Sequence, residues 1–313
     1  MVAIGSAGVL APGKWRWLRA LGWMAALCVG IVIGYNAVAK AVLWLLTLHN
    51  QAHPADRLLA AIAGSAAILL LYAAAVRWGE RRTVSELDLR PAPRELLVGM
   101  VTGGAAIAAV IAIQWFAGWV VIGPRNVDAV ALALRDSIRS GVLEELALRL
   151  VIFRLLWRAF GIWPALFMAA TIFGLLHLGN PGSDWFAALC LIAGEGIGIA
   201  LYLITGRIWA PIGMHAAWNF TQGWIFGAVV SGVTEIAGGP LTLKPAARVP
   251  DLLTGGGFGP EASLAALLVS LAASAAFLRW AWLRGDFKPR QESVAARSEE
   301  GRDLRAAEQR NAA

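Results

Sequence analysis

The sequence predicts an all-α fold, a polytopic transmembrane helix bundle with about eight spans and an interfacial amphipathic helix. Hydrophobic residues make up 58% of the 313 residues and charged residues only 15%, with a mean hydropathy of +0.64. Soluble domains are closer to half apolar and a quarter charged. Eight apolar stretches each approach the roughly 20 residues that a helix needs to cross hydrocarbon. Many of the 15 Trp lie near the ends of these stretches, as in interfacial belts.

The eight expected spans are 21–47, 58–76, 96–122, 141–159, 162–178, 185–205, 208–230 and 262–282. Lys40 interrupts the first span, and we expect it to snorkel or to face the bundle interior. Residues 124–140 alternate apolar and charged residues at helical spacing, which predicts a helix lying along the membrane interface. The longest connection, 231–261, is rich in Gly and Pro.

Charge divides the chain into a transmembrane domain, residues 1–283, and a tail, 284–313. The tail holds seven basic and six acidic residues with few large apolar ones, so we expect it to be disordered. The net charge is +7, but the basic residues lie in loops and form no stripe for nucleic acid. Their distribution places both termini in the cytoplasm. The Ala-, Arg- and Trp-rich composition suggests a bacterial chain, and hence a protein of the cytoplasmic membrane.

A short set of polar residues interrupts the later spans. Ionisable residues inside a membrane are costly and mark functional sites. The set comprises Glu144, Glu145, Arg149, His177, Glu195, His215 and Asn219.

The spacing of these residues predicts how they face one another. Glu145 and Arg149 are four residues apart and should pair on one helix face. Glu144 is rotated from Glu145 by about 100° and remains free to face another helix. His215 and Asn219 share a face at the same spacing. Phe173 and His177 repeat this spacing on another helix, so three helices each present one polar cluster.

This combination of groups supports hydrolysis by one of two routes. A carboxylate and an imidazole can activate water, while a second imidazole and an amide stabilise the oxyanion at the attacked carbonyl. Alternatively, Glu144, His177 and His215 could hold a divalent metal such as zinc with an open position for water. The sequence leaves the cofactor open between these routes.

Structural explanations compete with these functional ones. A single buried His is more often a packing residue than a catalyst, and a Glu–Arg pair can simply brace a bundle. Glu195 lies in "AGEGIGIA", where small residues permit close helix approach, so structural and site-adjacent roles are both open.

Three motifs in the right order resemble the CAAX protease and bacteriocin-processing (CPBP, or ABI) family of glutamate intramembrane proteases. The motif E-E-x-x-x-R stands as "EELALR" (144–149), F-x-x-x-H as "FGLLH" (173–177) and H-x-x-x-N as "HAAWN" (215–219). The resemblance covers a motif core at about 140–225. Family members trim prenylated C-terminal tails in eukaryotes or are linked to bacteriocin immunity or regulation in bacteria. A zincin motif, H-E-x-x-H, does not occur.

The resemblance implies an intramembrane endopeptidase and a role for each motif residue. Glu144 and His177 would activate water, and His215 with Asn219 would form the oxyanion site. The supporting residues would be Glu145, Arg149 and Phe173. The expected substrate is a membrane-associated or C-terminal peptide or protein within the lipid bilayer, and the oligomeric state is left open.

Two other functions use the same residues. A proton-coupled transporter could relay protons through Glu144, Glu195 and His177, although no internal repeat supports that architecture. A non-catalytic immunity or scaffold protein would only bind a partner. The expected topology also places Glu144 and His177 in the non-cytoplasmic half of their helices, away from any cytosolic tail.

Overall fold

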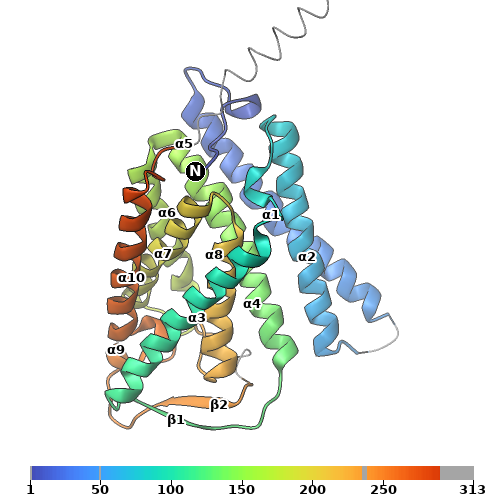
Figure 1. The fold of residues 1–313 in the computed structure, drawn as a ribbon. Coiled ribbons are helices and arrows are strands. Elements are labelled where there is room, and N and C mark those ends of the chain that lie inside the picture. Colours follow the sequence, from blue (N-terminus) through green and yellow to red (C-terminus); the bar gives the residue numbers. More distant parts are fainter. Residues whose placement is uncertain (1, 49–50, 235–237, 290–313) are drawn as a thin grey trace, which may run out of the picture.

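The computed structural model describes residues 2–48, 51–234 and 238–289, which form a helical bundle (Figure 1). The longer helices are α1 (Arg16–Leu46), α2 (Pro54–Ala74), α3 (Ala92–Phe116), α4 (Val130–Glu145), α6 (Ile162–Leu176), α7 (Trp185–Thr205), α8 (Trp209–Phe220) and α10 (Leu264–Leu283). Two shorter helices are α5 (Arg154–Phe160) and α9 (Asp251–Thr254). The expected disorder of 290–313 lies outside the described residues.

Six helical stretches are long and apolar enough to cross a membrane. They are Arg16–Leu46, Pro54–Gly79, Ala92–Phe116, Ile162–Gly179, Trp185–Thr205 and Leu264–Leu283. The other two expected spans carry site residues and are interrupted by π-helical segments, Leu146–Phe153 between α4 and α5 and Thr221–Ile225 after α8. The predicted all-α polytopic bundle is confirmed, and the protein is an integral membrane protein.

The structure differs from the prediction around residues 117–140. We expected an interfacial helix at 124–140, but α4 begins at Val130 and continues directly into the expected fourth span. Its polar residues Asp136, Ser137 and Ser140 are buried where α4 packs against α2 and α8. A buried polar face gives the same alternation in sequence as an interfacial helix, which explains the difference.

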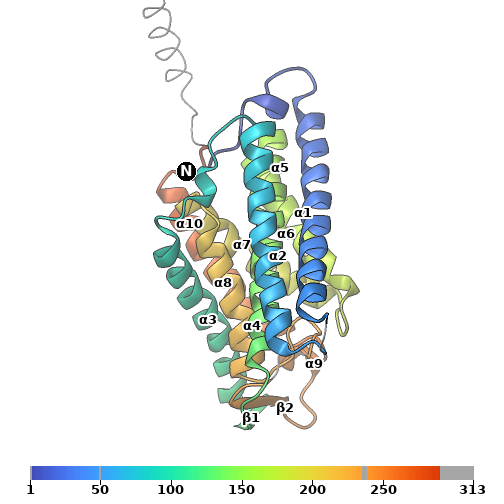
Figure 2. The ribbon, with the colours of Figure 1, turned by 90° about the vertical axis from the view of Figure 1, so that its right-hand side faces the viewer.

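A small antiparallel sheet joins segments far apart in the chain. The third helix ends at Phe116 rather than 122, and β1 (Val120–Pro124) pairs with β2 (Leu241–Pro245). Val and Ile in β1 favour the extended conformation. In Figures 1 and 2 the sheet lies at the end of the bundle opposite the N-terminus.

Close helix packing sets the frame around the site. The helix α3 crosses α8 where Gly99 and Gly103 face backbone carbonyls: a Cβ at either position would lie 2.0 Å from the carbonyl oxygen of Ala210 or Met214, respectively. A side chain at either glycine would force the helices apart. On the other side, α7 packs against α10 and α6.

The end of the bundle near the N-terminus is held by a buried ionic cluster. Arg154 donates to both carboxylate oxygens of Glu80 at 2.6 and 2.9 Å, and Arg82 bridges Glu80 and Glu86. Burial alone would raise the pKa of each carboxyl group, but the neighbouring guanidinium groups hold the pKa of Glu80 and of Glu86 below the usual range. Both glutamates are therefore charged partners that fasten the 80–91 connection to α5.

Candidate active site

The two glutamates of the first motif lie in the last turn of α4. The π-helical segment Leu146–Phe153 begins directly after Glu145. Such segments are rare and occur frequently at functional sites, because the extra residue per turn re-aims side chains. Glu144 faces the cavity with its side chain 30% exposed, whereas Glu145 is fully buried. The two adjacent carboxylates therefore point into different environments, as the helical rotation predicted.

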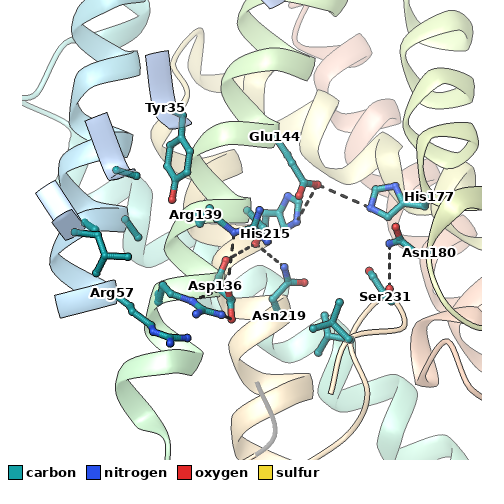
Figure 3. Close-up of a pocket in the computed structure, with 18 of the residues that line it drawn as sticks. Tyr35, Arg57, Asp136, Arg139, Glu144, His177, Asn180, His215, Asn219 and Ser231 are labelled. Atoms are coloured by element: carbon teal, nitrogen blue, oxygen red, sulfur yellow. Dashed lines mark hydrogen bonds and ion pairs between the residues drawn. The ribbon is translucent and has the colours of Figure 1, made fainter. Parts of the chain in front are cut away.

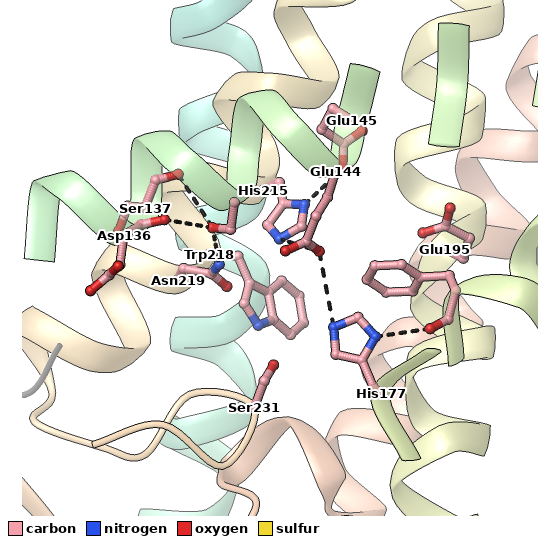
Figure 4. Close-up of polar contacts among 12 residues, drawn as sticks. Asp136, Ser137, Glu144, Glu145, His177, Glu195, His215, Trp218, Asn219 and Ser231 are labelled. Carbon is pink, nitrogen blue, oxygen red and sulfur yellow. Dashed lines mark hydrogen bonds and ion pairs between the residues drawn. The ribbon is translucent and has the colours of Figure 1, made fainter. Parts of the chain in front are cut away.

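His177 lies at the end of α6, where the helix tightens into a 3₁₀ turn. Its Nδ1 is 2.8 Å from the carbonyl oxygen of Phe173, so Nδ1 carries the proton and donates it. The Phe173 ring contacts the imidazole edge-on, with 4.6 Å between ring centroids. Phe173 thus orients His177 through both its ring and its carbonyl group, and Nε2 points to Glu144 Oε2 at 4.0 Å (Figure 4).

His215 projects from α8 to the same carboxylate. Its Nε2 lies 3.8 Å from Glu144 Oε2, and its Nδ1 lies 2.8 Å from Glu145 Oε1. One oxygen of Glu144 therefore faces the Nε2 atoms of both His177 and His215 (Figure 4). The structure brings together the residues of all three motifs.

A buried chain of charged groups continues behind His215. Glu145 Oε2 lies 2.8 Å from Arg149 Nε, and Arg149 places two further nitrogens 2.8 and 3.1 Å from the carboxylate of Glu195. These three side chains are at most 3% exposed. Gly198 makes room for the guanidinium group, since a Cβ there would lie 1.8 Å from a terminal nitrogen of Arg149. The predicted Glu145–Arg149 pair is present, and Glu195, whose role the sequence left open, completes it.

Asn219 lies one helical turn after His215 and is anchored to α4. Its Nδ2 donates to Ser140 Oγ at 2.8 Å, and Ser140 Oγ donates to the carbonyl oxygen of Asp136, also at 2.8 Å. Sequence reasoning missed Ser140, although it precedes Glu144 by four residues and so shares its helix face. The second N–H of Asn219 is available to a ligand.

A second residue that the sequence did not single out is Glu261, in the loop before α10. Its carboxylate accepts hydrogen bonds from the Ser231 hydroxyl at 2.7 Å and from Trp218 Nε1 at 3.1 Å. Burial raises the pKa of this carboxyl group above its usual value, against the opposing effect of those hydrogen bonds and of His177. Glu261 fixes Ser231, whose carbonyl oxygen also accepts from Asn180 Nδ2 at 3.0 Å, at the floor of the site.

These residues border a cavity of about 500 Å³, within the size range of ligand pockets. Its wall includes Glu144, His177, His215, Asn219 and Ser231 (Figure 3). A smaller cavity of about 70 Å³ shares His177 and His215 with the first one and is also lined by Glu145, Arg149, Glu195 and Glu261, among others. The two imidazoles therefore border both cavities.

The residues that would hold a metal here are Glu144, His177 and His215. Within the described ranges, no group of three or more His, Cys, Asp or Glu side chains converges closely enough to hold a metal ion. Glu144 Oε2 is 4.0 and 3.8 Å from the Nε2 atoms of His177 and His215, and His215 Nδ1 bonds Glu145, as the second ring nitrogen of a metal-binding His also does.

Fold and site together define a polytopic membrane protein with a carboxylate and two imidazoles converging on a cavity in the bundle. Residues 126–221 match the family model described as type II CAAX prenyl endopeptidase Rce1-like. The matched segment contains all three motifs, so the resemblance to CAAX proteases drawn from them is confirmed. No curated protein and no solved structure matches the chain. The family match indicates, in general terms, a CAAX-type intramembrane endopeptidase, which is a peptide hydrolase.

Proposed function

We propose that this chain is an intramembrane endopeptidase in which Glu144 and His177 activate a water molecule for attack on a peptide carbonyl. The observation that supports this most strongly is the position of Glu144 Oε2, 4.0 Å from His177 Nε2 and 3.8 Å from His215 Nε2 beside the large cavity. Direct hydrogen bonds are about 2.7–3.2 Å long, so these separations suit groups bridged by water.

The protonation of His177 suits a base in hydrolysis. Because Nδ1 of His177 donates to the Phe173 carbonyl, Nε2 can accept a proton. Water bound between Glu144 and His177 loses a proton to this pair as its oxygen attacks the carbonyl carbon. The same proton then passes to the leaving nitrogen and the second proton of the water stays on the acyl product, so one water gives a carboxylic acid and an amine, which ionise to a carboxylate and an ammonium group.

The other motif residues are placed to stabilise the oxyanion. Asn219 keeps one N–H for the substrate while Ser140 holds the other. His215, when protonated, donates Nε2–H toward the cavity and Nδ1–H to Glu145. Donors fixed in advance in this way reduce the reorganisation needed when charge develops on the carbonyl oxygen. Glu145, Arg149 and Glu195 position His215 and do not touch the substrate.

We propose that the cavity opens toward the end of the bundle that carries β1 and β2. Its wall includes Arg57, near the start of α2, and Figure 1 places the start of α2 at that end. We propose that both termini lie in the cytoplasm of a bacterium and that the cavity opens toward the other face of the cytoplasmic membrane. A substrate would then be a membrane-associated peptide or protein reached from the non-cytoplasmic side.

The test is cleavage of a single-span reporter peptide by the purified protein in lipid vesicles, with products identified by mass spectrometry. We expect Glu144→Gln and His177→Gln each to lower turnover by at least about 100-fold, the usual contribution of a positioned acid or base. Asp128→Asn is the matched control, because this acidic side chain is exposed at the same end of the bundle. Retained cleavage in folded Glu144→Gln would overturn the role proposed for Glu144, whereas no cleavage by the unmodified protein would favour the transporter or scaffold alternatives.

A further inference from the structure

The cavity has a basic side that the proposed reaction does not use. We call it the basic wall, and it consists of Lys40 on α1, Arg57 on α2, and Arg135 and Arg139 on α4. It borders the same cavity as Glu144 and His177. In Figure 3, Arg57 and His177 lie on opposite sides of Glu144. A ligand that extends through the cavity would meet the basic wall and the catalytic groups together.

Within the described ranges, the two arginines of α4 share one carboxylate. Arg135 Nε bonds Asp136 at 2.9 Å, and Arg139 Nε lies 3.6 Å from the same carboxylate. Among the described residues that line the cavity, Asp136 and Glu144 are the carboxylates, against four cations. These described lining residues therefore carry two more positive than negative charges.

Two members of the wall have no carboxylate partner among the described residues. Arg57 and Lys40 are both exposed, and no ion pair within the described ranges involves either of them. Lys40 lies in α1, one of the apolar membrane-spanning helices, where a cation is costly. The sequence left open whether Lys40 snorkels or faces the interior, and the structure places it on the cavity.

We infer that the basic wall is a subsite for an acidic side chain of the peptide substrate. This inference rests on the proposed function and narrows the substrate class. The cations face the cavity that contains Glu144, so the group they bind belongs to a molecule that also reaches the catalytic carboxylate. Attraction between the basic wall and an acidic side chain would fix which residue of an extended peptide lies beside the catalytic groups. The acidic residue therefore lies on the α1–α2 side of the scissile bond, and the carbonyl lies by Asn219.

Binding can be measured without turnover by using the Glu144→Gln protein in nanodiscs of zwitterionic lipid. Three fluorescent reporters share one transmembrane segment and carry Asp, Asn or Lys residues on one flank, with a second set carrying them on the other flank. We expect the Asp reporter to bind about five- to tenfold more tightly than the Asn reporter from one flank only. This preference should weaken as salt is added.

Reversing one charge of the basic wall tests whether the wall causes the preference for the Asp reporter. Arg57→Glu on the Glu144→Gln background should abolish the preference for Asp and favour the Lys reporter. Lys244→Glu makes the same charge change on the exposed strand β2 at the same end, outside the cavity wall, and should leave the order of affinities unchanged. In the enzyme with Glu144 intact, Arg57→Glu should raise KM for the Asp reporter more than it lowers kcat.

Two outcomes would overturn the inference. The first is equal affinity for the Asp, Asn and Lys reporters on both flanks. The second is an effect of Arg57→Glu that is the same for every reporter and occurs only with anionic lipid, which would assign the wall to a lipid headgroup. Neither outcome would contradict the proposed hydrolysis. The proposed hydrolysis is contradicted by a different result, which is cleavage that no longer requires Glu144.

Discussion

Arg149 offers the most quantitative test of the buried chain behind His215. Arg149→Met removes the cation that lies 2.8 Å from both Glu145 and Glu195, so that buried Glu195 loses its counter-charge and Glu145 keeps only its bond to His215. Removing one partner of a buried ion pair costs about 3–5 kcal/mol. At 1.4 kcal/mol per tenfold change, this lowers the ratio of folded to unfolded protein by about two to four orders of magnitude.

The assay is the denaturant midpoint in detergent, followed by size exclusion. Arg284→Met serves as the control, because Arg284 pairs with Asp286 at 2.9 Å but is 47% exposed, and such pairs contribute about 0–1 kcal/mol. Adding Glu195→Gln to Arg149→Met should recover part of the lost stability by removing one uncompensated charge. An Arg149→Met protein as stable as the Arg284→Met protein would refute the reasoning, as would a double variant less stable than Arg149→Met alone.

Three further predictions follow from the geometry. Asn219→Ala should lower kcat by about 100- to 1,000-fold with little change in KM, as loss of an oxyanion donor does, and an effect confined to KM would contradict its role. The depressed pKa values of Glu80 and Glu86 mean that they stabilise the fold fully above their unfolded pKa values and lose this effect as the pH falls through the folded ones. Unfolding midpoints measured from pH 7 down to pH 3 should therefore fall, and less steeply in Glu80→Gln. Treatment with a chelator, checked by elemental analysis, should leave turnover unchanged, whereas a loss restored by zinc would require a metal on Glu144, His177 and His215.

The sequence was informative wherever the membrane makes polar residues costly. Few ionisable side chains interrupt the later spans, so the spacing of Glu145 with Arg149 and of His215 with Asn219 was enough to predict shared faces. The structure brings Glu144, His177, His215 and Asn219 to one cavity and Glu145 with Arg149 to the smaller cavity beside it, and all six residues lie within the family match at residues 126–221. Their catalytic roles remain predictions.

Contacts between distant segments could not be predicted in the same way. The pairing of β1 with β2, the bond from Glu261 to Ser231 and the position of Arg57 on the cavity depend on how the helices pack. Residues 124–140 gave a pattern common to an interfacial helix and to a buried polar face, and only the packing of α4 against α2 and α8 distinguishes them.

The most direct test of the proposed mechanism is a single-turnover cleavage in H₂¹⁸O, with mass spectrometry of both product and enzyme. If Glu144 and His177 direct water onto the carbonyl, the new C-terminal carboxylate carries one ¹⁸O and the enzyme peptide containing Glu144 carries none. The Glu144→Gln protein should give no labelled product. An ¹⁸O atom in the Glu144 carboxylate would show that this side chain attacks the substrate itself and would contradict the account.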